Sequence, residues 1–213
     1  MLYNETNRGK YMKKFNALSN LEAFLIILLA ILVYLYTRQV GGEALEKESY
    51  KTTAANAYSM LSKASPQNTG IDSFAGRFSN ESSIIEHIGN SSKMLKFCHS
   101  AKTGGCWSDT WLWNEKEKPG TQLRSLQFIL VDFVAKDCSY STNIPNTCAF
   151  VYVDTNGAKK PNEVGKDILL FYMTRNGFIP AGTQIDTVTK GSDCDIKNNR
   201  YNWGCTAQLL GLK

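Results

Sequence analysis

The sequence lacks the short motifs of the common enzyme classes. It contains no HExxH zinc-protease motif, no GxSxG nucleophile motif and no Walker A loop. Histidine is scarce: His87 and His99 are the two in the chain, and we interpret both as structural. The sequence therefore predicts a protein that is not an enzyme, with an exported enzyme of unrecognised site as a minor alternative.

Runs of one charge are also missing. The 24 Lys and Arg residues outnumber the 19 Asp and Glu residues, but they form no cluster of five or more. Such a surface has no electrostatic footprint for nucleic acid. The composition is 43% hydrophobic and 20% charged, which excludes a disordered chain.

One long apolar run lies near the N-terminus. Every residue from 23 to 36 is apolar or aromatic, and residues 18–37 would form about 30 Å of helix, enough to span a bilayer. A signal-peptide core is the alternative for the shorter run. The flanking charges place the N-terminus in the cytoplasm and the rest outside: Arg8, Lys10, Lys13 and Lys14 before the run, and Glu43, Glu46 and Glu48 after it.

Glu22 lies inside this hydrophobic segment. A charge at the bilayer centre costs about 2.5–3.5 kcal/mol on insertion scales, so an intramembrane acid indicates a function. The alternative is that Glu22 marks where the span begins.

Two stretches resemble a known family. KKFNA-LSNLEAFLIILLAILVY resembles the start of type IV pilins and type II secretion pseudopilins, which have a basic leader, a small residue and a hydrophobic helix with Glu as its fifth residue. Residues 150–180 resemble the C-terminal part of pilin-like proteins, through the sequences VDTNG, PN and GKD. The resemblance implies cleavage by prepilin peptidase between Ala17 and Leu18, and methylation of the new N-terminus.

The resemblance also implies a function. The protein would be a structural subunit of a type IV pilus or type II secretion pseudopilus, held in the bacterial inner membrane and then drawn into a cell-surface filament. Glu22 would pair with the N-terminal amine of a neighbouring subunit. Its partners would be other pilin subunits, prepilin peptidase and the inner-membrane assembly platform. The alternative is an uncleaved, signal-anchored binding protein or adhesin.

The predicted fold class is α+β. Residues 1–17 form the leader, 18–41 the transmembrane and assembly helix, 42–66 an amphipathic helix, and 67–213 a disulfide-bonded globular head. Gly41-Gly42 predicts a weak point in the helix, and residues 83–97 look helical in parts, with a break at Gly89-Asn90. From residue 127 onward, short β-branched and aromatic runs predict an antiparallel meander packed on the amphipathic helix.

Six cysteines lie in the exported part, and none forms a CxxC pair. An even number in an oxidising compartment predicts disulfides, although six cysteines allow 15 pairings. Their grouping along the chain favours Cys98–Cys106, Cys138–Cys148 and Cys194–Cys205. Free buried thiols are the alternative.

The turn that begins at Asp154 has oxygen ligands spaced as in the opening of a calcium loop. Asp154 and Asn156 would be joined by Asp167, and some pseudopilins bind calcium in a C-terminal loop. The alternative is a hairpin turn capped by Asp154. Calcium is therefore a candidate cofactor at this loop.

Overall fold

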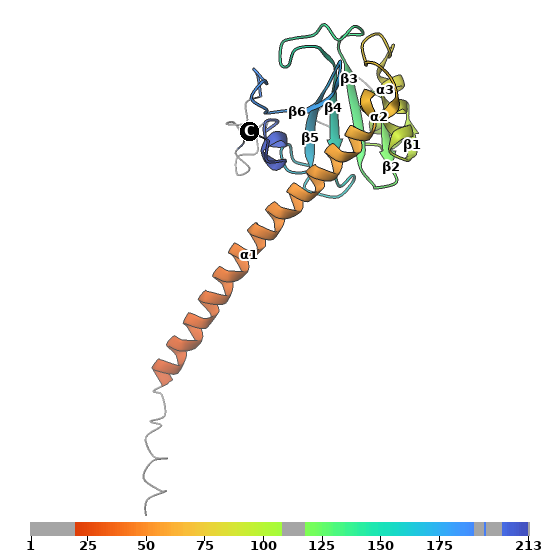
Figure 1. The fold of residues 1–213 in the computed structure, drawn as a ribbon. Helices are drawn as coiled ribbons and strands as arrows, with labels where there is room; N and C mark the ends of the chain where they lie inside the picture. The colour runs from red at the N-terminus through yellow and green to blue at the C-terminus, as the bar shows by residue number, and fades with distance from the viewer. Residues whose placement is uncertain (1–19, 108–117, 190–193, 195–201, 213) are drawn as a thin grey trace, which may run out of the picture. The chain divides into compact units, whose positions relative to one another are not determined.

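The computed structural model describes residues 20–107, 118–189, 194 and 202–212 (Figure 1). The chain divides into two compact units, Met1–Lys47 and Glu48–Lys213, which we call the N-terminal unit and the head. The elements are α1 (Asn20–Lys63), α2 (Pro66–Thr69), α3 (Glu81–Ser91), β1 (Met94–Cys98), α4 (Ala101–Gly104), β2 (Gly120–Leu123), β3 (Phe128–Phe133), β4 (Thr147–Asp154), β5 (Ile168–Thr174), β6 (Gly177–Pro180) and α5 (Cys205–Leu209).

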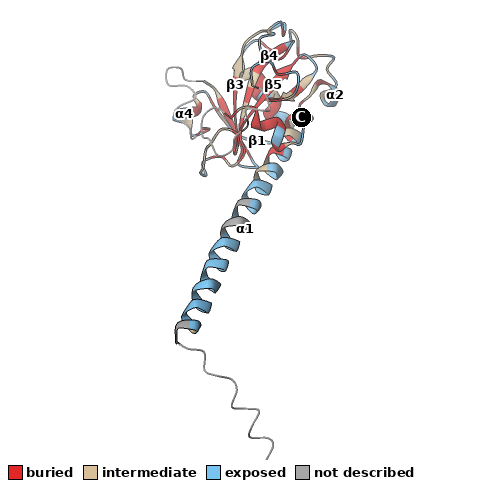
Figure 2. Cartoon of the chain, turned by 90° about the vertical axis from the view of Figure 1, so that its left-hand side faces the viewer, coloured by how far each residue is buried: buried red, intermediate tan, exposed pale blue. Residues whose placement is uncertain are grey.

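The part of the N-terminal unit that the structure describes is formed by the first turns of α1. Apart from half-buried Ala23, the side chains described in these turns are exposed, as the colouring of α1 in Figure 2 shows. The helix continues through Gly41 and Gly42, so the predicted weak point does not interrupt it. A helical Gly costs about 1 kcal/mol relative to Ala, which the good helix formers on either side can offset.

The predicted membrane-spanning helix over residues 18–41 is not supported. Within the described residues, no helix combines the length and the apolarity needed to cross a membrane. The uninterrupted apolar run covers 14 residues, 23–36. That run rises about 21 Å as a helix, against a hydrocarbon core of about 30 Å. Leu18, where the span was predicted to start, lies outside the described residues.

The head contains a six-stranded sheet in which the strands follow chain order from β1 to β6. Every neighbouring pair is antiparallel, which confirms the predicted meander and the α+β class. The turn between β5 and β6 is formed by Arg175 and Asn176, because Thr174 pairs directly with Gly177. The predicted Asn176-Gly177 turn is therefore displaced by one residue.

The prediction for residues 83–97 was wrong in two places. The helix α3 does not break at Gly89: a Cβ there would lie 3.1 Å from the Cβ and Sδ atoms of Met94, so this glycine serves packing. Residues 94–97 are not helical but belong to β1, which pairs with β2. The chain reverses at Lys93, whose φ of 60° is left-handed. A partner strand distant in sequence thus overrides the local helical pattern.

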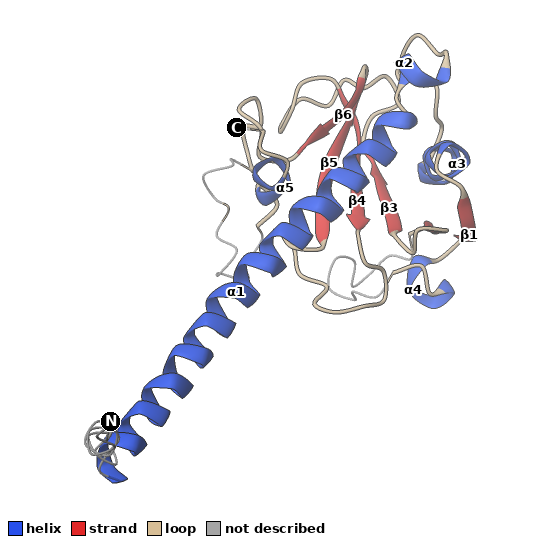
Figure 3. Cartoon of the chain, turned by 60° about the horizontal axis from the view of Figure 1, so that its bottom comes forward, coloured by secondary structure: helices blue, strands red, loops and turns tan. Residues whose placement is uncertain are grey.

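One face of the sheet is covered by the last turns of α1, which lie over β3, β4 and β5 (Figure 3). Ala54, Ala57 and Leu61 are fully buried there. Tyr58 stacks on Phe171 of β5, with ring centroids 6.2 Å apart. The last turns of α1, which lie within the amphipathic helix predicted over residues 42–66, therefore pack on the sheet, and small alanines allow the close approach. The helix ends at Lys63 and not at residue 66.

The C-terminal segment lies beside β5. Leu170 N donates to Thr206 Oγ1 (3.1 Å), and Ala207 N donates to Ala181 O (2.9 Å). These bonds satisfy backbone groups of β5 and the β6 end that would otherwise be an open sheet edge. The ring of Trp203 meets Tyr152 of β4 edge-on, with centroids 5.3 Å apart.

Candidate functional site

The residues predicted for processing and assembly lie at the start of the chain. Ala17 and Leu18, the predicted cleavage site, fall outside the described residues. Glu22 lies in the first turn of α1 and is exposed. An acid in the first turn interacts favourably with the helix dipole, so its position suits the helix as well as an assembly role.

All six cysteines form disulfides, and the pairing is the predicted one. Cys98 is bonded to Cys106, Cys138 to Cys148, and Cys194 to Cys205. No free thiol remains among them, which rules out the alternative of free buried cysteines. Each bridge closes a local loop of the head, so the three bridges restrain its loops rather than join distant elements.

The predicted ligand residues meet in the loop between β4 and β5, residues 154–167. Asp154 is fully buried, and its Oδ1 accepts hydrogen bonds from Asn156 N (3.2 Å) and Gly157 N (2.7 Å). This is the Asx turn of the alternative interpretation. Gly157 has a φ of +66°, and a Cβ there would lie 2.3 Å from Leu126 O, so this position requires glycine.

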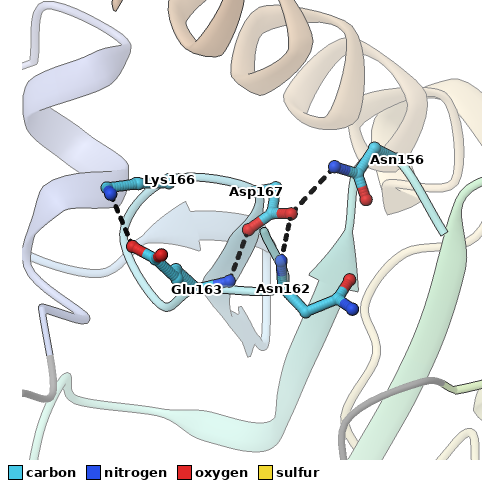
Figure 4. Close-up of polar contacts among 5 residues, drawn as sticks. All are labelled: Asn156, Asn162, Glu163, Lys166 and Asp167. Carbon is cyan, nitrogen blue, oxygen red and sulfur yellow. Dashed lines mark hydrogen bonds and ion pairs between the residues drawn. The ribbon is translucent and has the colours of Figure 1, made fainter. Parts of the chain in front are cut away.

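Asp167 is the centre of the loop (Figure 4). Its Oδ2 accepts from Asn156 Nδ2 (2.8 Å) and Asn162 N (2.7 Å), and its Oδ1 accepts from Glu163 N (2.6 Å). The backbone closes the same loop, since Thr155 N donates to Asp167 O (2.8 Å). The structure therefore brings Asp167 and Asn156 together, as the sequence predicted.

Burial is the main influence on the electrostatics of Asp167, because the residue is 1% exposed. Burial raises the pKa of this carboxyl above its ordinary value, and the hydrogen bonds from Glu163, Asn162 and Asn156 oppose the rise. Nearby, Lys166 Nζ lies 2.5 Å from Glu163 Oε2, an ion pair that is mostly shielded from solvent.

These residues do not make a good calcium site. Calcium takes six to eight oxygen ligands, whereas both Asp167 oxygens already accept N–H groups and Glu163 faces an ammonium. In the part of the chain that the structure describes, no three His, Cys, Asp or Glu residues lie close enough to hold a metal ion. Calcium binding stays an untested prediction, and the donor set does not fit it.

The loop also contacts the C-terminal segment. A Cβ at Gly165 would lie 2.7 Å from Asn202 Cβ and 3.0 Å from Cys205 Cβ. Gly165 has a φ of +83°, which favours glycine independently of this contact. The loop therefore touches the segment that carries one half of the Cys194–Cys205 disulfide.

Sequence reasoning missed a third buried acid. Asp186 is 2% exposed and accepts from Gly182 N (3.0 Å), Val188 N (3.1 Å) and Thr189 N (2.9 Å). An Asp followed by two residues and a Thr is a signal for an Asx-type loop, which could have identified it. Its carboxylate holds the loop that follows β6.

The two histidines have structural contacts. His87 is hydrogen-bonded through Nε2 to Ala64 O (2.7 Å) and lies against the rings of Phe74 and Phe78. His99 meets the ring of Phe97 edge-on. The candidate residues thus fall into the N-terminal residues predicted for assembly, three disulfides and one closed loop.

No protein-family model matches this chain, and neither a curated protein nor a solved structure is significantly similar to it.

Proposed function

We propose that this protein is a filament subunit of the type IV pilin or type II secretion pseudopilin kind. The observation that carries the proposal is the apolar surface of α1 between residues 24 and 36. Twelve large apolar side chains there are between 43% and 70% exposed in the single chain. A helix that is hydrophobic all round is normally buried, so this surface requires a partner.

The partner in this proposal is the same helix of neighbouring copies. Burying a Leu or Ile side chain stabilises by about 1.5–3 kcal/mol, so packing these helices together would drive assembly strongly. Glu22, at the start of the apolar stretch, would pair with the N-terminal amine of a neighbour. Such heterologous contacts do not close into a ring and therefore build an open filament.

Before assembly, the subunit would be held at the bacterial inner membrane by its apolar N-terminal segment. Prepilin peptidase would cut between Ala17 and Leu18, and an inner-membrane platform would add the subunit to the filament. The three disulfides of the head agree with a location outside the cytoplasm, where disulfides persist.

The deciding experiment places a charge on the apolar surface. Leu29→Lys should abolish filament assembly in the native host, because a buried lysine would have no counter-charge among packed helices. Ser49→Lys is the matched control: it adds the same charge to an exposed polar position of the same helix. Both proteins should retain the head fold, checked by near-ultraviolet circular dichroism. Filaments from Leu29→Lys at the wild-type level would contradict the proposal.

Processing provides a second check. The intact mass of the membrane-extracted protein should correspond to a chain that begins at Leu18, and Glu22→Ala should be processed but not assembled. A mass that retains residues 1–17, together with an absence of filaments, would favour the uncleaved binding protein.

A further inference from the structure

We propose that the β4–β5 loop is a metal-independent latch. Its own N–H and ammonium groups bind the carboxylates that would otherwise coordinate a divalent cation. We propose further that this latch holds the C-terminal segment of the head. The inference concerns the loop of residues 154–167 and does not depend on the filament function proposed above.

The charge of the loop is already balanced. Three acids, Asp154, Glu163 and Asp167, share it with three lysines, Lys159, Lys160 and Lys166. Lys166 acts locally, because its ammonium lies 2.5 Å from Glu163 Oε2. A divalent cation at this place would add two positive charges to a neutral loop and compete with Lys166 for the glutamate.

The carboxylate oxygens are already occupied as well. Asp167 accepts three N–H groups, and Asp154 Oδ1 accepts two more. Hydrogen bonds to a carboxylate are roughly twice as strong as neutral ones, so these five bonds hold the loop firmly. Asp167 Oδ2 and Asp154 Oδ1 each accept two N–H groups, so a metal ion could bind either of these two oxygens only by displacing an N–H group, which would leave a buried donor without a partner.

Three buried oxygens of the loop are evidence against the latch. Thr155 Oγ1, Asn156 Oδ1 and Glu163 Oε2 have no hydrogen-bond partner within the described residues, although Glu163 Oε2 forms the ion pair with Lys166. These are the atoms that a cation would use first. The test below therefore includes calcium directly.

Closure of the loop positions Gly165 against the C-terminal segment. Glu163, whose N–H bonds Asp167, accepts the N–H of Ile168 (3.1 Å), and Gly165 N donates to Ile168 O (2.9 Å). These bonds bring Gly165 into contact with Asn202 and Cys205. Opening the latch should therefore loosen residues 202–212 as well as the loop.

The first measurement is thermal melting of the purified full-length protein in millimolar calcium and in chelator. Selective binding to the folded state would raise the melting temperature through linkage. We expect coincident curves. A higher melting temperature in calcium, lost in Asp154→Asn, would overturn the inference and establish the loop as a calcium site.

The second measurement is hydrogen–deuterium exchange in chelator, followed in the loop and in residues 202–212. Asn156→Ala removes one donor to Asp167 and retains the carboxylate, so the head should still fold. We expect exchange in both segments to be about tenfold faster, as when one hydrogen bond of about 1.4 kcal/mol is lost. Asp167→Asn, which affects all three bonds, should increase it further.

The matched control is Asp72→Asn, which removes an exposed carboxylate from the loop between α2 and α3. This variant should exchange like the wild type in both segments. Unchanged exchange in Asn156→Ala and Asp167→Asn would overturn the latch. Faster exchange in the loop alone would overturn the link to the C-terminal segment. Neither result would affect the filament proposal, which is tested on α1.

Discussion

The two units of the chain differ in how far their apolar side chains are exposed. In the N-terminal unit, Leu29 is 66% exposed and Tyr36 is 70% exposed. In the head, Phe171, Ile85 and Leu61 are each 0% exposed. Both units are rich in large apolar side chains, so composition does not explain the difference.

The difference teaches that the units obtain their stability from different sources. The head buries its apolar groups within a single chain and adds three disulfides, so it is complete by itself. Within the described residues, the N-terminal unit is a helix whose large apolar side chains are exposed. Exposed apolar side chains gain no burial energy in the single chain.

A comparison of Phe171→Ala with Leu29→Ala tests this contrast and should show the largest effect. Phe171→Ala should lower the free energy of unfolding of the head by about 3–5 kcal/mol, because it leaves a cavity between the sheet and α1. Leu29→Ala should change it by less than about 0.5 kcal/mol. Urea unfolding followed by tryptophan fluorescence measures both. A large effect of Leu29→Ala would show that the N-terminal unit contributes to the stability of the single chain.

Removal of a disulfide should have the next largest effect. Cys138 and Cys148 are buried and separated by ten residues in sequence. Replacing both by Ala should destabilise the head by about 2–4 kcal/mol, mainly through greater freedom of the unfolded chain. The reduced and oxidised wild type, compared by urea unfolding, provide the control. No loss of stability would mean that packing alone holds these loops.

Gly182→Ala should cost about 1–3 kcal/mol, since its φ is +89° and a Cβ there would lie 2.1 Å from Gly204 O. Gly70→Ala separates the two causes, because Gly70 has a φ of +70° but no heavy atom within 4 Å of its Cβ position. Gly70→Ala should show the backbone strain without the clash, and therefore a smaller loss of unfolding free energy. Equal losses in the two variants would rule out the clash as the cause. Thermal melting of both variants gives the comparison.

The smallest effect is the pH dependence of Asp167. Its folded-state pKa is raised above 3.8, chiefly by burial. Between 3.8 and the raised value, the folded protein keeps a proton that the unfolded chain has lost. The contribution of this group to stability is therefore greatest below pH 3.8 and falls as the pH rises through the folded pKa. The stability difference between wild type and Asp167→Asn should shrink as the pH rises through this window.

Asp137 is the control of opposite sign. Hydrogen bonds from Ser139 lower its folded-state pKa below 3.8. Its contribution is present above pH 3.8 and is lost as the pH falls through the folded pKa. The free energy of unfolding should be measured from acid to neutral pH for the wild type and both variants. The difference between wild type and variant should rise with pH for Asp137→Asn and fall with pH for Asp167→Asn. Parallel slopes would contradict burial as the main cause at Asp167.

Sequence patterns predicted the strands β3 to β6, because runs such as residues 168–174 are apolar or aromatic up to the final threonine. They missed β1 and β2, whose residues carry no strong strand signal and pair only because the chain brings them together. The disulfide pairs were predicted from their spacing. The Asp154 turn was predicted as one of two alternatives. The structure shows the hydrogen bonds of the Asx turn, and calcium binding stays an untested prediction.

The sequence by itself indicated the strands β3 to β6, the local cysteine pairs and the apolar run of residues 23–36, because these depend on neighbours in the chain. The tertiary structure decided the rest. Residues 94–97 became a strand through pairing with β2. Gly89 lies within α3, and Met94 fills the space beside it. The carboxylate of Asp167 accepts hydrogen bonds from three N–H groups. Each of these outcomes depends on which groups meet across the fold, and spacing along the chain does not contain that information.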